Sequence, residues 1–418
     1  MFSGGVAKIC VQNFADKAGS ICHAISESTI NVLGKFLMRV AVLTNFIAPY
    51  RVPLLQELQK RTGQMKIFVS TPMEPNRSWA VEWRDLDVEI QKNLTFRRTW
   101  KHPKGFKDTL YVHFPYNTLH LLSKYQPDTI VSVEFGLRTL QAVLYCMIFR
   151  KTQLIVWAQI SESTEQARGT MRHWLRKFIT RRMDAVFVNG QSGKRYLKSN
   201  FGVPDEKFFF SPYTTNVSAF TSVPLERNES SANRLLYLGQ FIERKGIIPF
   251  FDVLKQWCID HPDRQTELWI AGDGPMREQL QNYKWPENIA VKFLNTIQYK
   301  DLPDLYASVG LLAFPTLADE WGLVTVEALA AGVLVLGSLY AQSVEEMIVD
   351  QKNGWTFYPN RPDTTYEALN SALTVEASTL QTMRLAGRES AIKITPEAVT
   401  NMMMEAIEYV HAVRTKHA

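Results

Sequence analysis

Short apolar runs alternate with amphipathic stretches along most of the chain. The first series of runs covers 39–44, 66–70, 128–133, 153–157 and 184–189, and the second covers 234–239, 267–272, 289–293, 311–314 and 334–337. Each run has the length of a buried strand, and most of the segments between them have helical periodicity. Strands that alternate with helices form parallel sheets covered on both faces. The pattern therefore predicts an α/β chain with two Rossmann-like, doubly wound domains.

The boundaries follow from breaks in this pattern. Residues 221–234 are polar and lack apolar periodicity, which is typical of a linker. We therefore expect a first domain at 38–220, a second at 235–395, and a helix at 396–418 that packs back on the first domain. Met38 opens the first strand, so we expect residues 1–37 to be a leader upstream of the true start. Two such domains face a cleft, where ligands are expected at the carboxyl ends of the strands.

Composition narrows the class of protein. The 418 residues are 46% hydrophobic and 21% charged, which excludes disorder, collagen and coiled coil for the whole chain. No uncharged apolar run has the roughly 20 residues that a membrane-spanning helix needs. The four cysteines lie far apart, without the spacing of a metal site or the density of a disulfide scaffold. The sequence therefore predicts a cytoplasmic protein.

Charge is divided unevenly between the two domains. Residues 38–220 carry a net charge of +13 and residues 221–418 a net charge of −8. The basic half should face an anionic partner, and nothing in the sequence indicates nucleic acid. The amphipathic stretch 165–182 holds six cations, and five of them form the candidate surface, namely Arg172, Arg176, Lys177, Arg181 and Arg182. The stretch predicts either peripheral contact with an anionic membrane surface or a solvated helix face, and both readings stay open.

Two loops of the second domain carry candidate chemistry. After its first strand come Gly239, Gln240 and Lys245, and a glycine beside a cation at a helix start suits phosphate. An ordinary turn with a solvated charge is the alternative. After a later strand come Asp319 and Glu320, and the following helix begins near Gly322. Its first residues, Leu323 and Val324, offer free N–H groups to a diphosphate, and Glu327 can accept hydrogen bonds from a ribose.

This second loop is similar to the acidic signature of retaining glycosyltransferases of family four, which have the GT-B fold. In that pattern Glu327 is the ribose ligand, and Asp319 takes the position of the donor-sugar contact. Asp319 is shorter than the usual Glu and precedes Glu320, so either side chain can be the one that reaches the sugar. Lys245 matches the family's lysine, whereas Gln240 stands where an Arg is common. Asn295 and Thr296 occupy the place of the loop that contacts the base.

The resemblance implies a hexosyltransferase of polysaccharide biosynthesis. Its nucleotide-diphosphate sugar is a substrate, its acceptor is a glycan or a lipid-linked sugar, and configuration is retained without a cofactor or metal. Asp319, Glu320 and Glu327 are the expected catalytic residues. Many relatives place a His after a first-domain strand, but 156–162 has none, so Gln159 and Glu162 are the acceptor-side candidates.

Two other functions stay open. A non-catalytic, membrane-associated scaffold with this fold is favoured by Gln240, Asp319 and the missing His. A dinucleotide-binding oxidoreductase is disfavoured, because neither 43–48 nor 238–246 contains Gly-x-Gly-x-x-Gly after its strand.

Overall fold

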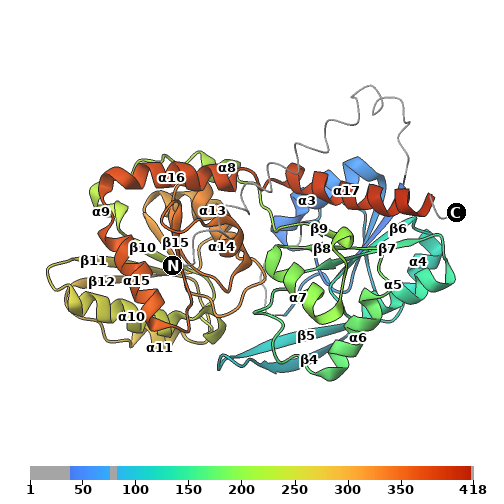
Figure 1. Cartoon of the computed structure of the whole chain (residues 1–418), viewed down its shortest axis with the longest axis horizontal. Helices are drawn as coiled ribbons and strands as arrows, with labels where there is room; N and C mark the ends of the chain where they lie inside the picture. Colours follow the sequence, from blue (N-terminus) through green and yellow to red (C-terminus); the bar gives the residue numbers. More distant parts are fainter. Residues whose placement is uncertain (1–37, 76–81, 416–418) are drawn as a thin grey trace.

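The computed structural model describes residues 38–75 and 82–415, and the predicted leader lies outside the described residues. Two α/β domains lie side by side, and the last helix runs back across the first of them (Figure 1). Each domain is built on a parallel sheet covered by helices, which confirms the predicted fold class.

The first domain contains a parallel sheet of seven strands in the order β3-β2-β1-β6-β7-β8-β9. The strands are β1 (Met38–Thr44), β2 (Gly63–Val69), β3 (Val88–Ile90), β6 (Thr129–Val133), β7 (Gln153–Ala158), β8 (Ala185–Val188) and β9 (Phe208–Phe210). Its helices are η1 (Pro49–Arg51), α3 (Val52–Thr62), α4 (Thr118–Tyr125), α5 (Leu137–Ile148), α6 (Thr170–Thr180), α7 (Gln191–Phe201) and η2 (Asp205–Lys207).

Burial on both faces explains the apolar runs of the sequence. Val40 and Val42 of β1 pack in one core cluster, while Ala41 and Leu43 pack in another on the opposite face. Successive side chains of a strand point to opposite faces, so a central strand buried on both sides must be apolar throughout.

Besides the short strand β9, an antiparallel hairpin of the first domain was not predicted. Strands β4 (Asn93–Lys101) and β5 (Lys107–Pro115) form an antiparallel hairpin outside the parallel sheet. The hairpin extends along the lower edge of the view toward the second domain (Figure 1). Most of β4 is exposed, so its charged side chains hide the alternating pattern by which a strand is recognised.

The second domain contains six parallel strands in the order β12-β11-β10-β13-β14-β15. The strands are β10 (Leu235–Leu238), β11 (Thr266–Ala271), β12 (Ile289–Leu294), β13 (Leu311–Phe314), β14 (Leu334–Ser338) and β15 (Gly354–Phe357). Its helices are η3 (Glu243–Lys245), α10 (Ile247–Asp260), α11 (Arg277–Gln281), η4 (Tyr299–Asp301), α12 (Leu302–Ala307), α13 (Leu323–Ala330), α14 (Gln342–Met347), α15 (Pro362–Thr374) and α16 (Ala377–Ala391).

The two connections between the domains are both packed. Helices α8 (Ser218–Thr221) and α9 (Glu229–Ala232) lie in or beside the predicted linker. Val217, Phe220 and Val223 belong to a core cluster of the second domain, so that core begins before residue 221. The return connection is α17 (Pro396–Thr415), whose Met403 and Ile407 are fully buried in the first domain.

Candidate active site

Four loops of the second domain meet at the carboxyl edge of its sheet. They follow β12, β11, β10 and β13, which are neighbours in that order. In register, Leu238 lies beside Ala271, and Ala271 beside Leu294. The predicted Gly239 follows directly and donates its N–H to the Ala271 carbonyl at 3.1 Å. Asn295 and Thr296 are exposed on the loop after β12.

The Lys245 loop lies tightly against the acidic loop. Gly246 has φ +65°, and a Cβ atom there would lie 2.1 Å from the Pro315 carbonyl oxygen, so this position requires glycine. Leu317 donates its N–H to the Arg244 carbonyl at 2.8 Å. Two segments about seventy residues apart in sequence are thereby held side by side.

Asp319 is the centre of this contact. Its Oδ2 atom lies 2.5 Å from Lys245 Nζ and 3.8 Å from Arg244 Nη1. Burial alone would raise the pKa of Asp319, but the two cations outweigh it and hold that pKa below the usual range. The structure thus brings Asp319 and Lys245 together, and it adds Arg244, which sequence reasoning missed although it adjoins Lys245.

Glu327, the predicted ribose ligand, is buried on the helix that follows the acidic loop. Gly322 precedes α13 with φ +100°, where a Cβ atom would lie 2.5 Å from the Phe314 ring. Leu323 and Val324 form the start of α13, and Glu327 on the same helix is only 5% exposed.

The Glu327 carboxylate has a single recorded hydrogen-bond donor among the described residues, the Tyr306 hydroxyl of α12 at 3.3 Å. Burial raises the pKa of Glu327 to about 7, although the bond from Tyr306 lowers it. Glu327 therefore has unused acceptor capacity at the base of the site. Tyr306 was not a candidate from the sequence, because nothing local distinguishes it from a core tyrosine.

The first domain forms hydrogen bonds to the backbone of the acidic loop. The Glu320 carbonyl accepts hydrogen bonds from Asn189 Nδ2 at 3.2 Å and from Gln342 Nε2 at 2.7 Å. The Ser161 hydroxyl donates to the Asp319 carbonyl at 3.4 Å. Gln342 also donates to the Ile160 carbonyl at 2.8 Å, so it joins both domains at one point.

The carboxyl group of Glu320 has a different environment from that of Asp319. Burial raises the pKa of Glu320 to about 7, Arg244 lowers it, and the negative charges of Asp319 and Glu134 raise it further. Glu134 belongs to the first domain, at the carboxyl end of β6. The two adjacent acids thus have pKa values shifted in opposite directions, because Lys245 contacts Asp319 directly.

Glu134 is a site residue that the sequence did not indicate. Its φ is +65°, an uncommon left-handed conformation for a side chain other than Gly, Asn or Asp. Such a conformation costs about 1 to 3 kcal/mol and is concentrated at functional sites. The backbone is held there because the Glu134 N–H donates to the Trp157 carbonyl at 2.9 Å.

The two acceptor-side candidates, Gln159 and Glu162, have different surroundings. Gln159 is 7% exposed, and its Nε2 atom finds no hydrogen-bond partner in the described part of the chain. Glu162 instead forms an ion pair with Arg195 at 2.7 Å, and its side chain is 46% exposed. Arg195 also pairs with Glu345 of the second domain at 2.7 Å. Glu162 therefore takes part in an exposed ion-pair network at the domain boundary, and its acceptor-side role stays a prediction.

The basic stretch also needs one correction. Arg176 is 1% exposed and pairs with Glu165 at 2.5 Å, so it cannot contact an outside surface. Arg181 and Arg182 are exposed, and Arg172 and Lys177 are partly exposed. The helix α6 is rotated so that Met171 and Trp174 face outward, at 78% and 68% exposure.

Over 38–75 and 82–415, no helix is both long and apolar enough to cross a bilayer. In the same ranges, no group of three or more His, Cys, Asp or Glu side chains could hold a metal ion.

Comparisons of the sequence identify relatives of part of the chain. Residues 224–390 match the family of glycosyl transferases group 1. An uncharacterized glycosyltransferase of Methanocaldococcus jannaschii is 30% identical over 190 residues, which are 43% of this chain and 48% of that protein. A Campylobacter jejuni α-1,4-N-acetyl-D-galactosaminyltransferase, named for a PP-undecaprenol-linked substrate, is 26% identical over 51% of this chain and 56% of its own. The chain thus spans about half the length, or less, of the first curated relatives it matches.

Solved structures with the same fold cover nearly the whole chain. The lipopolysaccharide outer core galactosyltransferase WaaB has a TM-score of 0.67 at 12% identity, over 89% of this chain and 99% of that one. Anabaena HepE in complex with UDP has a TM-score of 0.66 at 15% identity, over 89% and 100%. These neighbours show a GT-B fold. Lys245, Asp319, Glu320 and Glu327 all lie within residues 224–390, the segment that matches the glycosyl transferases of group 1.

Proposed function

We propose that the protein transfers a sugar from a nucleotide-diphosphate donor to a hydroxyl of an acceptor, with retention of configuration. The observation that carries this proposal is the pairing of Lys245 with Asp319 beside the start of α13, with Glu327 buried on that helix. It lies within the segment that matches the group 1 family. HepE, which shares the fold, is solved with UDP-glucose.

The donor is proposed to lie along the carboxyl edge of the second sheet. Glu327 would accept hydrogen bonds from the ribose hydroxyls, because its carboxylate has acceptor capacity to spare. Lys245 and the N–H groups at the start of α13 would hold the diphosphate. The Asn295 loop, exposed beside β11, would contact the base.

Asp319 and Glu320 of the acidic loop are assigned to the donor sugar and to the acceptor. Asp319 is placed on the donor-sugar side, since it shares Lys245 with the diphosphate. Glu320 is influenced by Glu134 of the first domain and is placed on the acceptor side. In the reaction, the bond from the anomeric carbon to the diphosphate oxygen breaks as a bond to the acceptor oxygen forms on the same face. The acceptor proton passes to the departing diphosphate, whose charge Lys245 stabilises.

The acceptor is proposed to be a glycan or a lipid-linked sugar, used in the cytoplasm at an anionic membrane surface. Met171 and Trp174 are exposed on α6 beside Arg172, Lys177, Arg181 and Arg182. Outward aromatic and apolar side chains flanked by cations suit the headgroup region of such a bilayer. Two relatives have names that specify lipid-linked substrates, PP-undecaprenol in Campylobacter jejuni and a phosphatidylinositol mannoside in Corynebacterium glutamicum.

The test is nucleotide binding followed by turnover. UDP, GDP and ADP are titrated while the thermal midpoint is measured, and one of them should raise it progressively. Glu327→Gln should weaken that ligand at least about tenfold, since a hydrogen bond to a charged group is worth roughly 1.5 to 3 kcal/mol. The control Glu367→Gln changes an exposed residue of α15 and should bind normally. If all three nucleotides fail to bind, or Glu327→Gln binds as the wild type does, the assignment is wrong.

A further inference from the structure

The β4–β5 hairpin, which lies outside both parallel sheets, reaches from the first domain to the loops of the proposed donor site. Lys104, in the turn of the hairpin, donates through Nζ to the Leu317 carbonyl at 2.9 Å. The Lys107 N–H donates to Glu243 Oε2 at 3.1 Å. Leu317 lies in the acidic loop, and Glu243 begins η3, the short helix that ends at Lys245. The hairpin therefore contacts both of the loops to which the diphosphate and the donor sugar are assigned.

The first domain fixes the tip of the hairpin in place. Trp100 donates its indole N–H to the Gln166 carbonyl at 3.0 Å, and His102 Nε2 lies 2.8 Å from the Ser163 carbonyl oxygen. The rings of His102 and Phe106 stack with their centroids 4.3 Å apart. Gln166 and Ser163 follow β7 of the first domain. The tip is thus part of the first domain, and any separation of the two domains on this side must break its contacts with the second.

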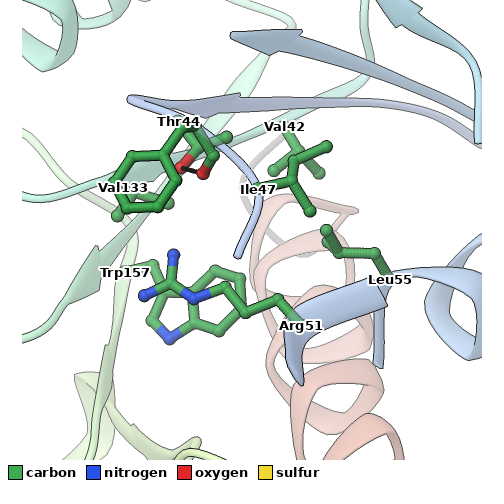
Figure 2. A pocket seen from close by; sticks show the side chains of 8 residues that line it. Val42, Thr44, Ile47, Arg51, Leu55, Val133 and Trp157 are labelled. Carbon is green, nitrogen blue, oxygen red and sulfur yellow. Dashed lines mark hydrogen bonds between the residues drawn. The ribbon is translucent and has the colours of Figure 1, made fainter. Parts of the chain in front are cut away.

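The junction between the hairpin tip and the second domain is loosely packed. A pocket of about 230 Å³ lies there, with Lys104, Phe106, Ile247, Met276 and Leu317 in its wall. By contrast, the pocket at the carboxyl ends of β1, β6 and β7 inside the first domain measures about 10 Å³, roughly the space of one water molecule (Figure 2). Domain interiors contain few voids larger than a water molecule. The junction therefore lacks the close packing that holds each domain together.

The burial of Lys104 weakens the same contact. Its ammonium lies over the Tyr340 ring, and its second hydrogen-bond acceptor, the Ser163 hydroxyl, is 3.5 Å away. None of the ion pairs within 38–75 and 82–415 includes Lys104. Burial lowers the pKa of Lys104 to about 7. A cation that loses its hydration without gaining an acid offsets part of the stabilisation from its hydrogen bonds, so the tip can leave the second domain at modest cost.

With the hairpin in contact, the charges of the donor site are satisfied by one another. Lys245 pairs with Asp319 at 2.5 Å, and Arg244 pairs with Asp108 of the hairpin at 2.9 Å. A diphosphate that binds Lys245 must compete with Asp319 for its ammonium. This arrangement therefore opposes the entry of a donor until the pairs rearrange.

We propose that the β4–β5 hairpin is an interdomain strap, which releases the loops at 243–245 and 317–319 each time a nucleotide enters or leaves the site. This inference rests on the proposed function, because the ligand that the strap admits is the nucleotide of the donor. The strap forms the same contacts over the empty site and over the filled site, so it slows entry and exit alike. A weaker strap should therefore raise both rate constants by the same factor and leave the dissociation constant unchanged.

The test is stopped-flow binding of the nucleoside diphosphate that stabilises the wild type most, followed by intrinsic tryptophan fluorescence. Lys104→Met removes the hydrogen bond to Leu317 with little change in side-chain volume. It should raise the association and dissociation rate constants at least about fivefold each, as expected for the loss of one hydrogen bond from a charged group. Lys207→Met is the matched control, because Lys207 also donates to a backbone carbonyl, that of Met183 at 2.7 Å, but within the first domain.

A second variant tests the strap from the other domain. Glu243 is exposed, so Glu243→Ala is expected to fold even if Lys104→Met does not. The substitution removes the acceptor of the Lys107 N–H. Both rate constants should again rise by equal factors, although by less than in Lys104→Met, because the lost contact is more exposed.

Equal rises in the two rate constants, absent from Lys207→Met, support the strap. The proposal is overturned if the dissociation rate constant alone rises, because the hairpin would then hold the nucleotide as an ordinary contact does. It is also overturned if neither rate constant changes in either variant, or if Lys207→Met behaves as they do. Failure of the proposed function is distinct from these results, since the wild type would then bind no nucleotide and the strap would have no ligand to admit.

Discussion

Asp108 of the β4–β5 hairpin is a first-domain residue that we expect to control the donor side of the site. Its Oδ2 atom accepts a hydrogen bond from Arg244 Nε at 2.9 Å. Arg244 in turn donates through Nη1 to the Ala318 carbonyl at 2.9 Å, and the same Nη1 lies 3.8 Å from Asp319. Asp108→Ala therefore removes one of two carboxylates that flank a nearly buried guanidinium.

The exposure of the Arg244–Asp108 pair determines how far Asp108→Ala should lower the free energy of unfolding. The side chains of Arg244 and Asp108 are 16% and 27% exposed. Exposed pairs contribute about 0 to 1 kcal/mol, whereas breaking a buried pair costs roughly 3 to 5 kcal/mol. This pair lies between those limits, so Asp108→Ala should lower the free energy of unfolding by about 2 kcal/mol. Asp108→Asn keeps a hydrogen-bond acceptor and should cost about half as much.

Donor recognition should change as well. Without Asp108, Arg244 can close the 3.8 Å separation from Asp319, which would then be held by two cations. A carboxylate held by two cations gives up those contacts less readily to bind sugar hydroxyls. We expect affinity for the intact nucleotide sugar to fall about fivefold, close to 1 kcal/mol, while affinity for the sugar-free nucleotide changes little.

Urea unfolding and calorimetric titration of both ligands measure the two effects. Asp205→Asn is the matched control, because Asp205 pairs with Lys194 and Lys198 on an exposed surface far along the chain from the hairpin. If Asp108→Ala unfolds at the wild-type urea concentration and binds both ligands normally, the hairpin does not position Arg244 and the reasoning fails.

Three further predictions concern charged side chains. Lys245→Ala should weaken nucleoside diphosphate far more than the bare nucleoside, and equal losses in titration would place Lys245 away from the phosphates. Burial raises the pKa of Glu346 from 4.5 to about 7, so its contribution to stability is complete below pH 4.5 and is lost as pH rises through 7. The free energy of unfolding of Glu346→Gln should therefore rise relative to that of the wild type by up to about 3 kcal/mol between pH 5 and pH 8. An equal difference between the two proteins in urea unfolding at both pH values would contradict this. Reversing Lys177, Arg181 and Arg182 should abolish salt-sensitive sedimentation with acidic vesicles while nucleotide binding persists, and sedimentation that ignores lipid charge would exclude the electrostatic account.

Local sequence carried enough information to predict the sheets and the acidic loop. A strand buried on both faces must be apolar throughout, as 40–43 of β1 are, and no distant partner is needed to recognise it. The acidic loop is one continuous stretch in which Asp319, Gly322 and Glu327 have fixed spacing. Lys245 could be assigned for the same reason, since it follows the first strand of its domain.

The features that the sequence did not predict depend on contacts between distant segments. Trp100 and Phe106 of the hairpin pack on Leu317 and Ala318 of the other domain, which lie about two hundred residues away in sequence. Arg176 looked like a surface cation, because its buried partner Glu165 precedes the helix by several residues. On the same helix, Met171 and Trp174 face outward at 78% and 68% exposure, a choice that helical spacing alone left open.

Under the proposed function, the backbone contacts at the acidic loop should couple donor binding to acceptor binding. Ser161 and Asn189 of the first domain donate to the carbonyl groups of Asp319 and Glu320, whose side chains are assigned to the donor and acceptor sides. A donor that shifts this loop must alter those bonds, and an acceptor that moves the first domain must alter them equally. Coupling between two binding free energies is reciprocal, so the factor by which donor affects acceptor affinity must equal the reverse factor. Truncating Asn189 should reduce both factors together, because one set of hydrogen bonds carries them.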